Sequence, residues 1–270
     1  MIKFLQYGNM VMQTDTRYDV RAIRSGGTDA QMEGSFSSGP KTSYGDENAQ
    51  RIPVHQQVYQ QLREAVLFGE LAPGEAVTIQ GLIERTGAGM TPIREAIRRL
   101  TSEGALEFRG NRRVCVPMPT VEGIDELIFL REMLEPQLAA RAAARASEAD
   151  INALEAIDDG LDDAIAQGDV GAYLRRNYAF HDKLYSIAAA PILTEVAVGL
   201  WLRFGPSMRV VCGRMGTQNL PDNHKKALDA LRAGDTDATA DAIREDVLQG
   251  MEQMRAALES SGLDGELIDR

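Results

Sequence analysis

Residues 91–100 read TPIREAIRRL, a segment that predicts a short helix with two different faces. Thr91 suits the N-cap position and Pro92 the first helical position, so we expect the helix to begin here. Its apolar residues recur every three or four positions, whereas Arg94 and Arg98 lie four residues apart and share another face. An apolar back and a cationic front are what a helix needs to enter the major groove of DNA, where arginine binds guanine or phosphate.

The sequence on either side of this helix predicts two more helices and two strands. Amphipathic patterns run over residues 54–67 and around Leu82, and glycine or proline residues end both of them. Strand-like runs at 105–108 and 114–116 flank a polar turn that holds three arginines. Three helices followed by a two-stranded ribbon is the order of a winged helix-turn-helix domain.

In a winged helix, the third helix contacts base edges and phosphates, and the turn of the ribbon touches the DNA backbone or the minor groove. We therefore predict DNA contacts at Thr91, Arg94, Arg98, Arg112 and Arg113. On charge pattern alone, an ordinary surface helix with solvated arginines explains the same residues equally well.

This region also resembles the N-terminal domain of GntR-family transcription regulators. The resemblance rests on GEL at 69–71 before a Pro-Gly turn, on the helix start at 91–96, and on GAL at 104–106 leading into the ribbon. It implies a winged helix that binds double-stranded DNA. The chain has Gly-Met at 89–90 where the family usually has Ser-Arg, and Arg113 where it usually has glycine. One expected DNA contact is thus lost and one cation is gained, which alters operator preference or affinity.

Beyond the proline-rich boundary at 117–119, the sequence is helical by pattern. Helices are predicted at 121–145, 148–167, 169–189, 192–212, 222–233 and 235–260. The predicted fold class is mainly α, with an N-terminal winged helix-turn-helix domain followed by an all-α helical bundle. We predict a disordered tail rich in Gly and Ser at 1–50 and the winged domain at 51–119. The helical domain follows at 120–260, and a C-terminal tail at 261–270 ends the chain.

Charge divides the chain in the same way. Residues 51–119 hold 9 Lys and Arg against 7 Asp and Glu, a net +2, whereas residues 120–270 hold 15 against 27, a net −12. The net charge of −11 over the whole chain argues against a protein that binds polyanions along its full length. The small N-terminal unit is the part whose charge suits DNA.

Cysteine content and hydropathy indicate the compartment. Cys115 and Cys212 are far apart and form no CxxC motif, which argues against a disulfide-stapled secreted protein. No uncharged apolar run approaches the ~18 residues that a membrane span needs, and the first residues lack the apolar core of a signal peptide. We therefore predict a soluble cytoplasmic protein.

The helical region contains a set of polar residues that could bind a metal ion. Asn177 and His181 are four residues apart on one predicted helix, so their side chains share a face. His224 opens another helix and Asp246 lies on the last one. Imidazole and carboxylate groups suit zinc, nickel or another divalent ion. Spacing alone favours the simpler alternative, in which each histidine is a satisfied polar residue.

Residues 122–255 resemble the FCD ligand-sensing domain, the all-α partner of the winged helix in the FadR subfamily of GntR regulators. The matching pieces are LREMLEP at 130–136, NYAFHDKL at 177–184 and HKKALDALRAGD at 224–235. The resemblance implies a small-molecule effector that binds within the helical bundle.

Many FCD domains bind a divalent metal through one Asp and three His, and the matching positions here are Asn177, His181, His224 and Asp246. The set retains one carboxylate and two imidazoles, so the resemblance implies a divalent cofactor, zinc or nickel before others. Since an Asn amide is a poor zinc ligand, a regulator that senses its effector without metal remains an alternative.

Two arginines are candidates for effector binding. Arg131 resembles a family position that faces the effector cavity, where a guanidinium can hold a carboxylate bidentately. A salt bridge between packed helices explains Arg131 equally well. Arg203 is a second candidate, next to Trp201 and Phe204, which we expect to be core or dimer contacts.

Together these features predict a transcription regulator that binds a pseudo-palindromic operator as a homodimer, because such proteins recognise two half-sites. A small organic acid or related metabolite would change operator affinity, with release of a repressor as the expected direction. A metal-dependent enzyme is the alternative from another class, since a metal with open positions can activate water. No general base or nucleophile is arranged near the predicted ligands, which argues against it.

Overall fold

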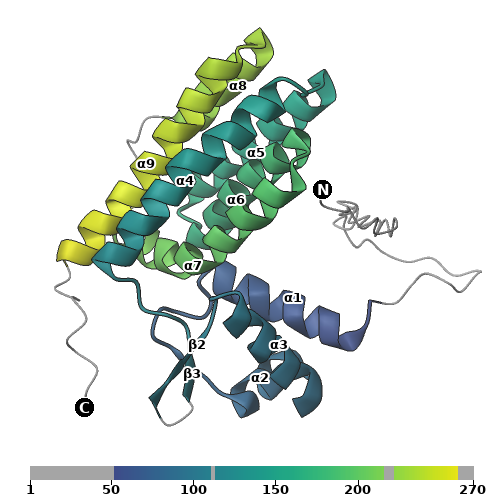
Figure 1. The fold of residues 1–270 in the computed structure, drawn as a ribbon, viewed down its shortest axis with the longest axis vertical. Helices are drawn as coiled ribbons and strands as arrows, with labels where there is room; N and C mark the ends of the chain where they lie inside the picture. Colours follow the sequence, from purple (N-terminus) through teal and green to yellow (C-terminus); the bar gives the residue numbers. More distant parts are fainter. Residues whose placement is uncertain (1–51, 111–112, 216–221, 261–270) are drawn as a thin grey trace, which may run out of the picture. The chain divides into compact units, whose positions relative to one another are not determined.

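The computed structural model of the chain describes residues 52–110, 113–215 and 222–260. The predicted tails at 1–50 and 261–270 lie outside these residues, as does Arg112. The described part is mainly helical, as the sequence predicts, and its elements are drawn in Figure 1.

The N-terminal elements form a winged helix. The helices are α1 (Val54–Leu67), α2 (Ile79–Thr86) and α3 (Met90–Ser102), and the strands are β1 (Ala76–Val77), β2 (Glu107–Arg109) and β3 (Arg113–Cys115). The strands form an antiparallel sheet in the order β1-β3-β2, in which Val114 of β3 lies opposite Phe108 of β2 and Val77 of β1. The predicted ribbon is therefore present, and the two-residue strand β1, which the sequence did not indicate, extends it.

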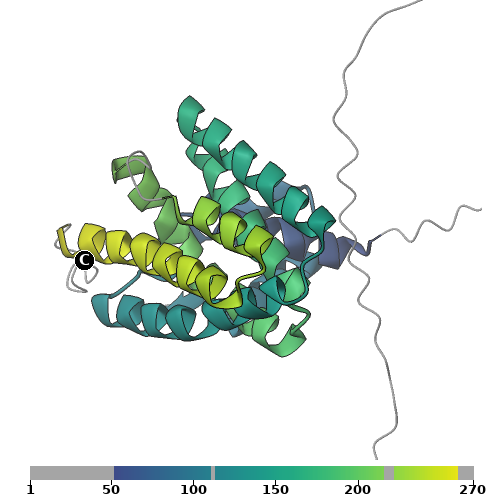
Figure 2. The same cartoon turned by 90° about the horizontal axis from the view of Figure 1, so that it is seen from above.

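The remaining helices form a bundle. They are α4 (Val121–Ala143), α5 (Glu148–Gln167), α6 (Val170–Ala188), α7 (Pro191–Met215), α8 (Asn223–Ala233) and α9 (Thr236–Ser260). Helix α4 packs on α6, α7 and α9, and α5 packs on α6 and α8. Figure 2 shows α4 and α9 side by side along much of their length. Side chains on the inner faces of α4, α6, α8 and α9 therefore meet within the bundle.

Short polar residues fix where these helices begin. A side-chain oxygen accepts a hydrogen bond from a backbone N–H of the first turn at Thr120, Ser147, Asp169 and Asp222, which are the N-caps of α4, α5, α6 and α8. Gly168 and Gly234 end α5 and α8 in the left-handed conformation that glycine adopts without strain.

Helix α7 also packs against α1 of the winged helix. At Gly205 the two helices approach so closely that a methyl group there would overlap the carbonyl oxygen of Leu67. Arg209, one turn further along, donates to the carbonyl oxygen of Phe68 at 3.3 Å. In the described residues, no helix is long and apolar enough to cross a membrane.

Candidate DNA-binding surface and sensor site

Helix α3 is divided in the way its sequence predicts. Ile93 and Leu100 are fully buried against the rest of the winged helix, whereas Thr91, Arg94 and Arg98 are exposed. Burial of the apolar face fixes the rotation of the helix, and this rotation directs the two arginines to solvent. The predicted cationic face is thus available to a ligand.

The two arginines share a surface depression of about 580 Å³ with part of the ribbon. Arg113 of β3 lines it together with Arg94 and Arg98, and Phe108 of β2 lies there with 63% of its surface exposed. The structure therefore brings three of the five predicted DNA contacts together. Thr91 is exposed at the start of α3 but does not line the depression.

Arg99, the third arginine of α3, is engaged within the protein. Its guanidinium lies 3.7 Å from the centre of the Tyr59 ring and its Nε is 3.0 Å from Oε1 of Glu103. The Tyr59 hydroxyl donates to Glu103, and burial together with this carboxylate raises the pKa of Tyr59 to about 12. Arg99 therefore supports the packing of α1 on α3.

Inside the bundle, three predicted metal ligands meet. His181 Nε2 of α6 lies 3.1 Å from Oδ2 of Asp246 on α9, and His224 Nε2 of α8 lies 3.7 Å from the other oxygen of the same carboxylate. Both histidines are buried and Asp246 is partly buried. One ligand atom from each of the three residues lies within 4.8 Å of the others.

Asn177 and Arg131 lie beside this cluster. Both line, with Asp246, a small cavity of about 40 Å³. Asn177 is 7% exposed and sits one turn before His181 on α6. The structure thus brings all four predicted metal ligands and the first predicted effector residue to one place.

The second nitrogen of each imidazole faces a buried carboxylate. His224 Nδ1 lies 3.1 Å from Oδ1 of Asp158 on α5, and the His224 ring stacks on Phe180 at a centroid distance of 3.9 Å. His181 Nδ1 lies 3.1 Å from Oε2 of Glu135 on α4, at ion-pair distance though not aligned as a hydrogen bond. Both histidines therefore direct Nε2 towards Asp246.

Opposite charges keep this cluster ionised. Burial alone would raise the pKa of Glu135, but Arg131 and His181 lower it to about 2. Burial also opposes ionisation of Asp246, whose pKa the two histidines and Arg131 lower to about 2. Burial would lower the pKa of His181, but the hydrogen bond with Asp246 and the negative charges of Glu135 and Asp246 raise it to about 9.

Arg131 is held on two sides. Its Nε donates to Oε1 of Glu135 one turn along α4, and its guanidinium lies 4.1 Å from the centre of the Phe204 ring and 4.9 Å from that of Trp201. The salt bridge that the sequence left open is therefore present. Arg131 also lines the cavity with Asn177 and Asp246, so the salt bridge does not remove Arg131 as a candidate for effector binding.

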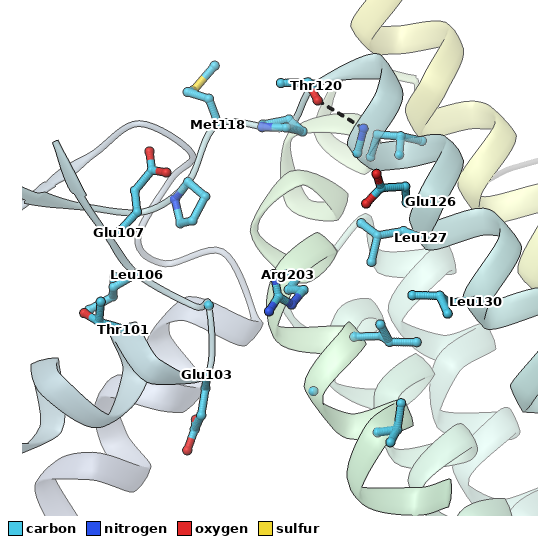
Figure 3. A pocket seen from close by; sticks show the side chains of 18 of the residues that line it. Thr101, Glu103, Leu106, Glu107, Met118, Thr120, Glu126, Leu127, Leu130 and Arg203 are labelled. Atoms are coloured by element: carbon cyan, nitrogen blue, oxygen red, sulfur yellow. Dashed lines mark hydrogen bonds between the residues drawn. The ribbon is translucent and has the colours of Figure 1, made fainter.

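Arg203 lies elsewhere. It lines a cavity of about 860 Å³ between the winged helix and helices α4 and α7, whose lining does not include Arg131. Figure 3 shows its guanidinium between Leu106 and Leu127, and it lies against Gly104 at the exit from α3. The structure therefore does not bring Arg203 to the cavity of Arg131.

The donor set fits a divalent metal ion. Two imidazole nitrogens and a carboxylate are ligands that zinc and nickel accept. Within the described residues, the buried Nε2 of His224 has no hydrogen-bond partner, although a buried polar atom normally has one. A metal ion between His181, His224 and Asp246 would satisfy that nitrogen.

Sequence reasoning missed the two carboxylates behind the histidines. Asp158 lies on the buried face of α5 between Leu154 and Leu161, at helical spacing. Glu135 lies on the buried face of α4, four residues after Arg131. The sequence did offer one signal, which is a single acidic residue within an apolar stripe. Such a residue is buried with the stripe, and a buried carboxylate requires a partner.

Comparison with known proteins identifies both parts of the chain. A family model described as "Bacterial regulatory proteins, gntR family" matches residues 54–116, and the model of the FCD domain matches residues 126–249. The first covers the winged helix and the second covers most of the bundle, including Arg131 and the four predicted metal ligands.

The chain is similar to the HTH-type transcriptional regulator McbR of Escherichia coli, with 28% identity over 72% of this chain and 90% of the relative. It is 23% identical to the "Probable D-xylose utilization operon transcriptional repressor" of Paenarthrobacter nicotinovorans, over 73% of this chain and 87% of that protein. The solved structure of E. coli McbR/YncC aligns with a TM-score of 0.69 at 27% identity, covering 78% of this chain and 99% of that one. The chain therefore contains a helix-turn-helix domain of the gntR family of bacterial regulatory proteins followed by an FCD domain, and the relatives that it matches are transcription regulators rather than enzymes.

Proposed function

We propose that the protein binds a pseudo-palindromic operator as a homodimer in the cytoplasm, and that a small carboxylate in the bundle changes its affinity for that operator. The division of α3 carries the DNA part of the proposal. Arg94 and Arg98 are exposed over a buried apolar face, and Arg113 of the ribbon lies beside them. This is the disposition in which a winged helix contacts base edges and phosphates.

Operator binding can be tested with sites selected from random duplex DNA. We expect Arg94→Ala and Arg98→Ala each to weaken binding by about 1–3 kcal/mol if the arginine contacts guanine. An arginine that contacts only phosphate would instead lower the salt dependence by roughly one released ion. Arg232→Ala is the matched control, because Arg232 is an exposed arginine on α8 of the bundle. Equal binding by all three variants would contradict the proposed DNA surface.

The homodimer has support in an exposed apolar patch. Helix α4 exposes Phe129, Leu130 and Met133, and α7, which packs on α4, exposes Ile192 and Val196. Leu130 and Val196 line one cavity, so the two groups are close. Exposed apolar side chains gathered on neighbouring helices are typical of protein–protein contacts. A second copy of the chain is the occupant that two operator half-sites require.

The sensor has support in the cluster around Asp246. His181, His224 and Asp246 would hold a divalent metal, with Asn177 as the fourth group beside them. A bound divalent ion supplies a positive centre that accepts carboxylate or hydroxyl oxygens of a metabolite. Arg131 lines the same cavity, so its guanidinium can pair with the carboxylate of the effector.

Metal content of the untagged purified protein, measured by mass spectrometry, tests this assignment. We expect about one divalent ion per chain in the wild type and its loss in His181→Ala, because His181 is one of only two imidazoles in the set. His55→Ala is the control, since His55 is an exposed histidine on α1. Absence of metal from the wild type after addition of zinc, nickel or manganese would remove the metal from the proposal.

One observation favours the second candidate, a sensor that works without metal. His181 Nε2 and Asp246 already lie 3.1 Å apart, and Arg131, Glu135, His181 and Asp246 form a set of paired charges. In that case Arg131 and hydrogen bonds alone would hold the effector. The same mass-spectrometric measurement distinguishes the two candidates, and it leaves the DNA-binding proposal intact.

Helix α7 is the element that we propose couples the two sites. Its Phe204 contacts the guanidinium of Arg131, and the next residue, Gly205, packs on Leu67 of α1. A metabolite needs more room than the cavity of about 40 Å³ provides, so its binding would displace side chains around Arg131. A coupling of about 1–3 kcal/mol between the sites would change operator affinity by roughly 5–150-fold. By analogy with the relative named as a repressor, the expected direction is release from DNA.

A further inference from the structure

Two buried carboxylates lie behind the proposed metal ligands. Asp158 is 2% exposed and Glu135 is fully buried, although neither belongs to the group that faces the centre of the cluster. Burying a carboxylate is costly unless a specific partner compensates for the lost water. The partners of Asp158 and Glu135 therefore indicate the role of each carboxylate.

Asp158 contacts the imidazole of His224. Its Oδ1 lies 3.1 Å from Nδ1 of His224, and Phe180 stacks on the face of the same ring with an interplanar angle of 9°. A proton on Nδ1 leaves Nε2 with its lone pair, and the carboxylate favours that tautomer. The ring is thus fixed in both plane and tautomer, with Nε2 towards Asp246.

Glu135 contacts an imidazole and a guanidinium at once. Its Oε1 accepts from Nε of Arg131, and its Oε2 lies 3.1 Å from Nδ1 of His181. The hydroxyl of Tyr185 donates to the same Oε2 at 2.6 Å, and Trp201 Nε1 donates in turn to Tyr185 at 3.1 Å. Glu135 is therefore held rigidly while it faces one imidazole and one guanidinium.

We propose that Asp158 and Glu135 are positioning residues, which hold His224 and His181 with Nε2 ready for a divalent ion, and that Glu135 also holds Arg131 at the edge of the effector cavity. The inference rests on the proposed metal site and extends it to residues outside the ligand set. Carboxylates behind metal-bound histidines raise the basicity of the ring and fix its orientation, and their loss typically lowers metal affinity 10–100-fold.

The test measures zinc affinity of the full chain by competition with a chromophoric chelator. We expect Asp158→Ala to bind zinc roughly 10–100-fold more weakly than the wild type. Asp158→Asn should recover part of this loss, because an amide oxygen still accepts from Nδ1. Asp163→Ala is the matched control: Asp163 lies on the same helix α5, is exposed, and does not belong to the acidic group that Asp158 forms with Asp162 and Asp222. This control removes the same charge without touching an imidazole.

Glu135→Gln provides a second test, in which zinc affinity and melting temperature are both measured. It should also weaken zinc binding, and it should lower the melting temperature of the metal-free protein more than Asp158→Ala does, because it leaves Arg131 buried without its carboxylate. Tyr185→Phe is its control, since it removes one hydrogen bond to Glu135 and leaves the contacts of Glu135 with Arg131 and His181 in place. If Glu135→Gln does not fold, the two Asp158 variants decide the question, because they leave the Arg131–Glu135 pair intact.

The outcomes separate this inference from the metal site itself. Wild-type zinc affinity in Asp158→Ala and Glu135→Gln would overturn the positioning roles while the metal site stands. An equal loss in Asp163→Ala would overturn them as well, because the loss would then follow from removal of any negative charge on α5 and not from a lost contact with His224. A wild type that binds no zinc would remove the metal site and this inference together, whereas binding of operator DNA would be unaffected.

Discussion

At the scale of single residues, Gly205 sets how closely the winged helix and the bundle pack. A side chain there would overlap the carbonyl oxygen of Leu67, so only glycine allows α7 to approach α1 to this distance. We expect Gly205→Ala to lower the free energy of unfolding by about 1–3 kcal/mol, the usual cost of overpacking. Urea unfolding monitored by circular dichroism measures this change.

Gly199→Ala is the control on the same helix. A methyl group at Gly199 meets no atom within 4 Å, so the substitution should stabilise α7 by up to about 1 kcal/mol through helix propensity. A stabilised Gly205→Ala would show that the contact between α1 and α7 is less tight than described.

Individual site residues differed in how far the sequence could indicate them. The resemblance to the FCD domain gave the positions of His181, His224 and Asp246, and the structure brings these residues together. Asp158 and Glu135 were not indicated, because an i, i+4 pattern reveals a shared face but not which face is buried. Arg203 was predicted as an effector residue, but its side chain points to the winged helix, although its neighbours in sequence are core residues.

At the scale of elements, the start of α5 is fixed by a reciprocal cap. Ser147 accepts from the backbone N–H of Asp150, the Asp150 carboxylate accepts from that of Ser147, and Lys183 of α6 adds an ion pair at 2.6 Å. The hydrogen bonds from Lys183 and Ser147 lower the pKa of Asp150 from 3.8 to about 2. Asp150 therefore stabilises the folded protein at neutral pH and loses this effect in acid.

The sign of the pH dependence follows from that shift. Because the folded-state pKa is depressed, the contribution of Asp150 is complete above pH 3.8 and disappears as the pH falls through about 2. We expect Asp150→Asn to be less stable than the wild type by about 1 kcal/mol at pH 7, with the difference narrowing below pH 4. Urea unfolding at a series of pH values measures the difference. Glu148→Gln, an exposed change in the same turn, should show a smaller one, and a constant difference down to pH 2 would contradict the assignment.

Elements were predicted well where the pattern is local. The limits of α5 were predicted as 148–167 and are Glu148–Gln167, because a serine cap and a terminal glycine mark both ends. Helix α7 runs to Met215, past the predicted end at 212, and it continues through Pro206, as the predicted range 192–212 does. Strand β1 was missed because two residues carry no periodicity, and they become a strand only by pairing with β3.

At the scale of the whole molecule, the exposed patch on α4 and α7 bears on the oligomeric state. Met133 is one of the residues of this patch and is 62% exposed. We expect Met133→Glu to convert a dimer into a monomer, because a desolvated charge opposes burial of an apolar face. Sedimentation velocity at several concentrations gives the mass directly.

The dimer prediction has a control elsewhere on the surface. Val54→Glu places the same charge on an exposed valine at the start of α1 and should leave the mass unchanged. If Met133→Glu remains a dimer, the patch is not the interface. If it becomes a monomer, its affinity for a full operator should fall far more than its affinity for a half-site, since the two domains no longer bind together.

Trp201 has a practical consequence for the study of this protein. It is the only tryptophan in the chain, and its ring lies 5.2 Å from the His181 ring and 4.9 Å from the guanidinium of Arg131. Any change in the occupancy or charge of these neighbours alters the surroundings of a single fluorophore. The chain therefore carries a built-in optical reporter, whose emission would follow a metal or effector titration without a label and without a contribution from any second indole.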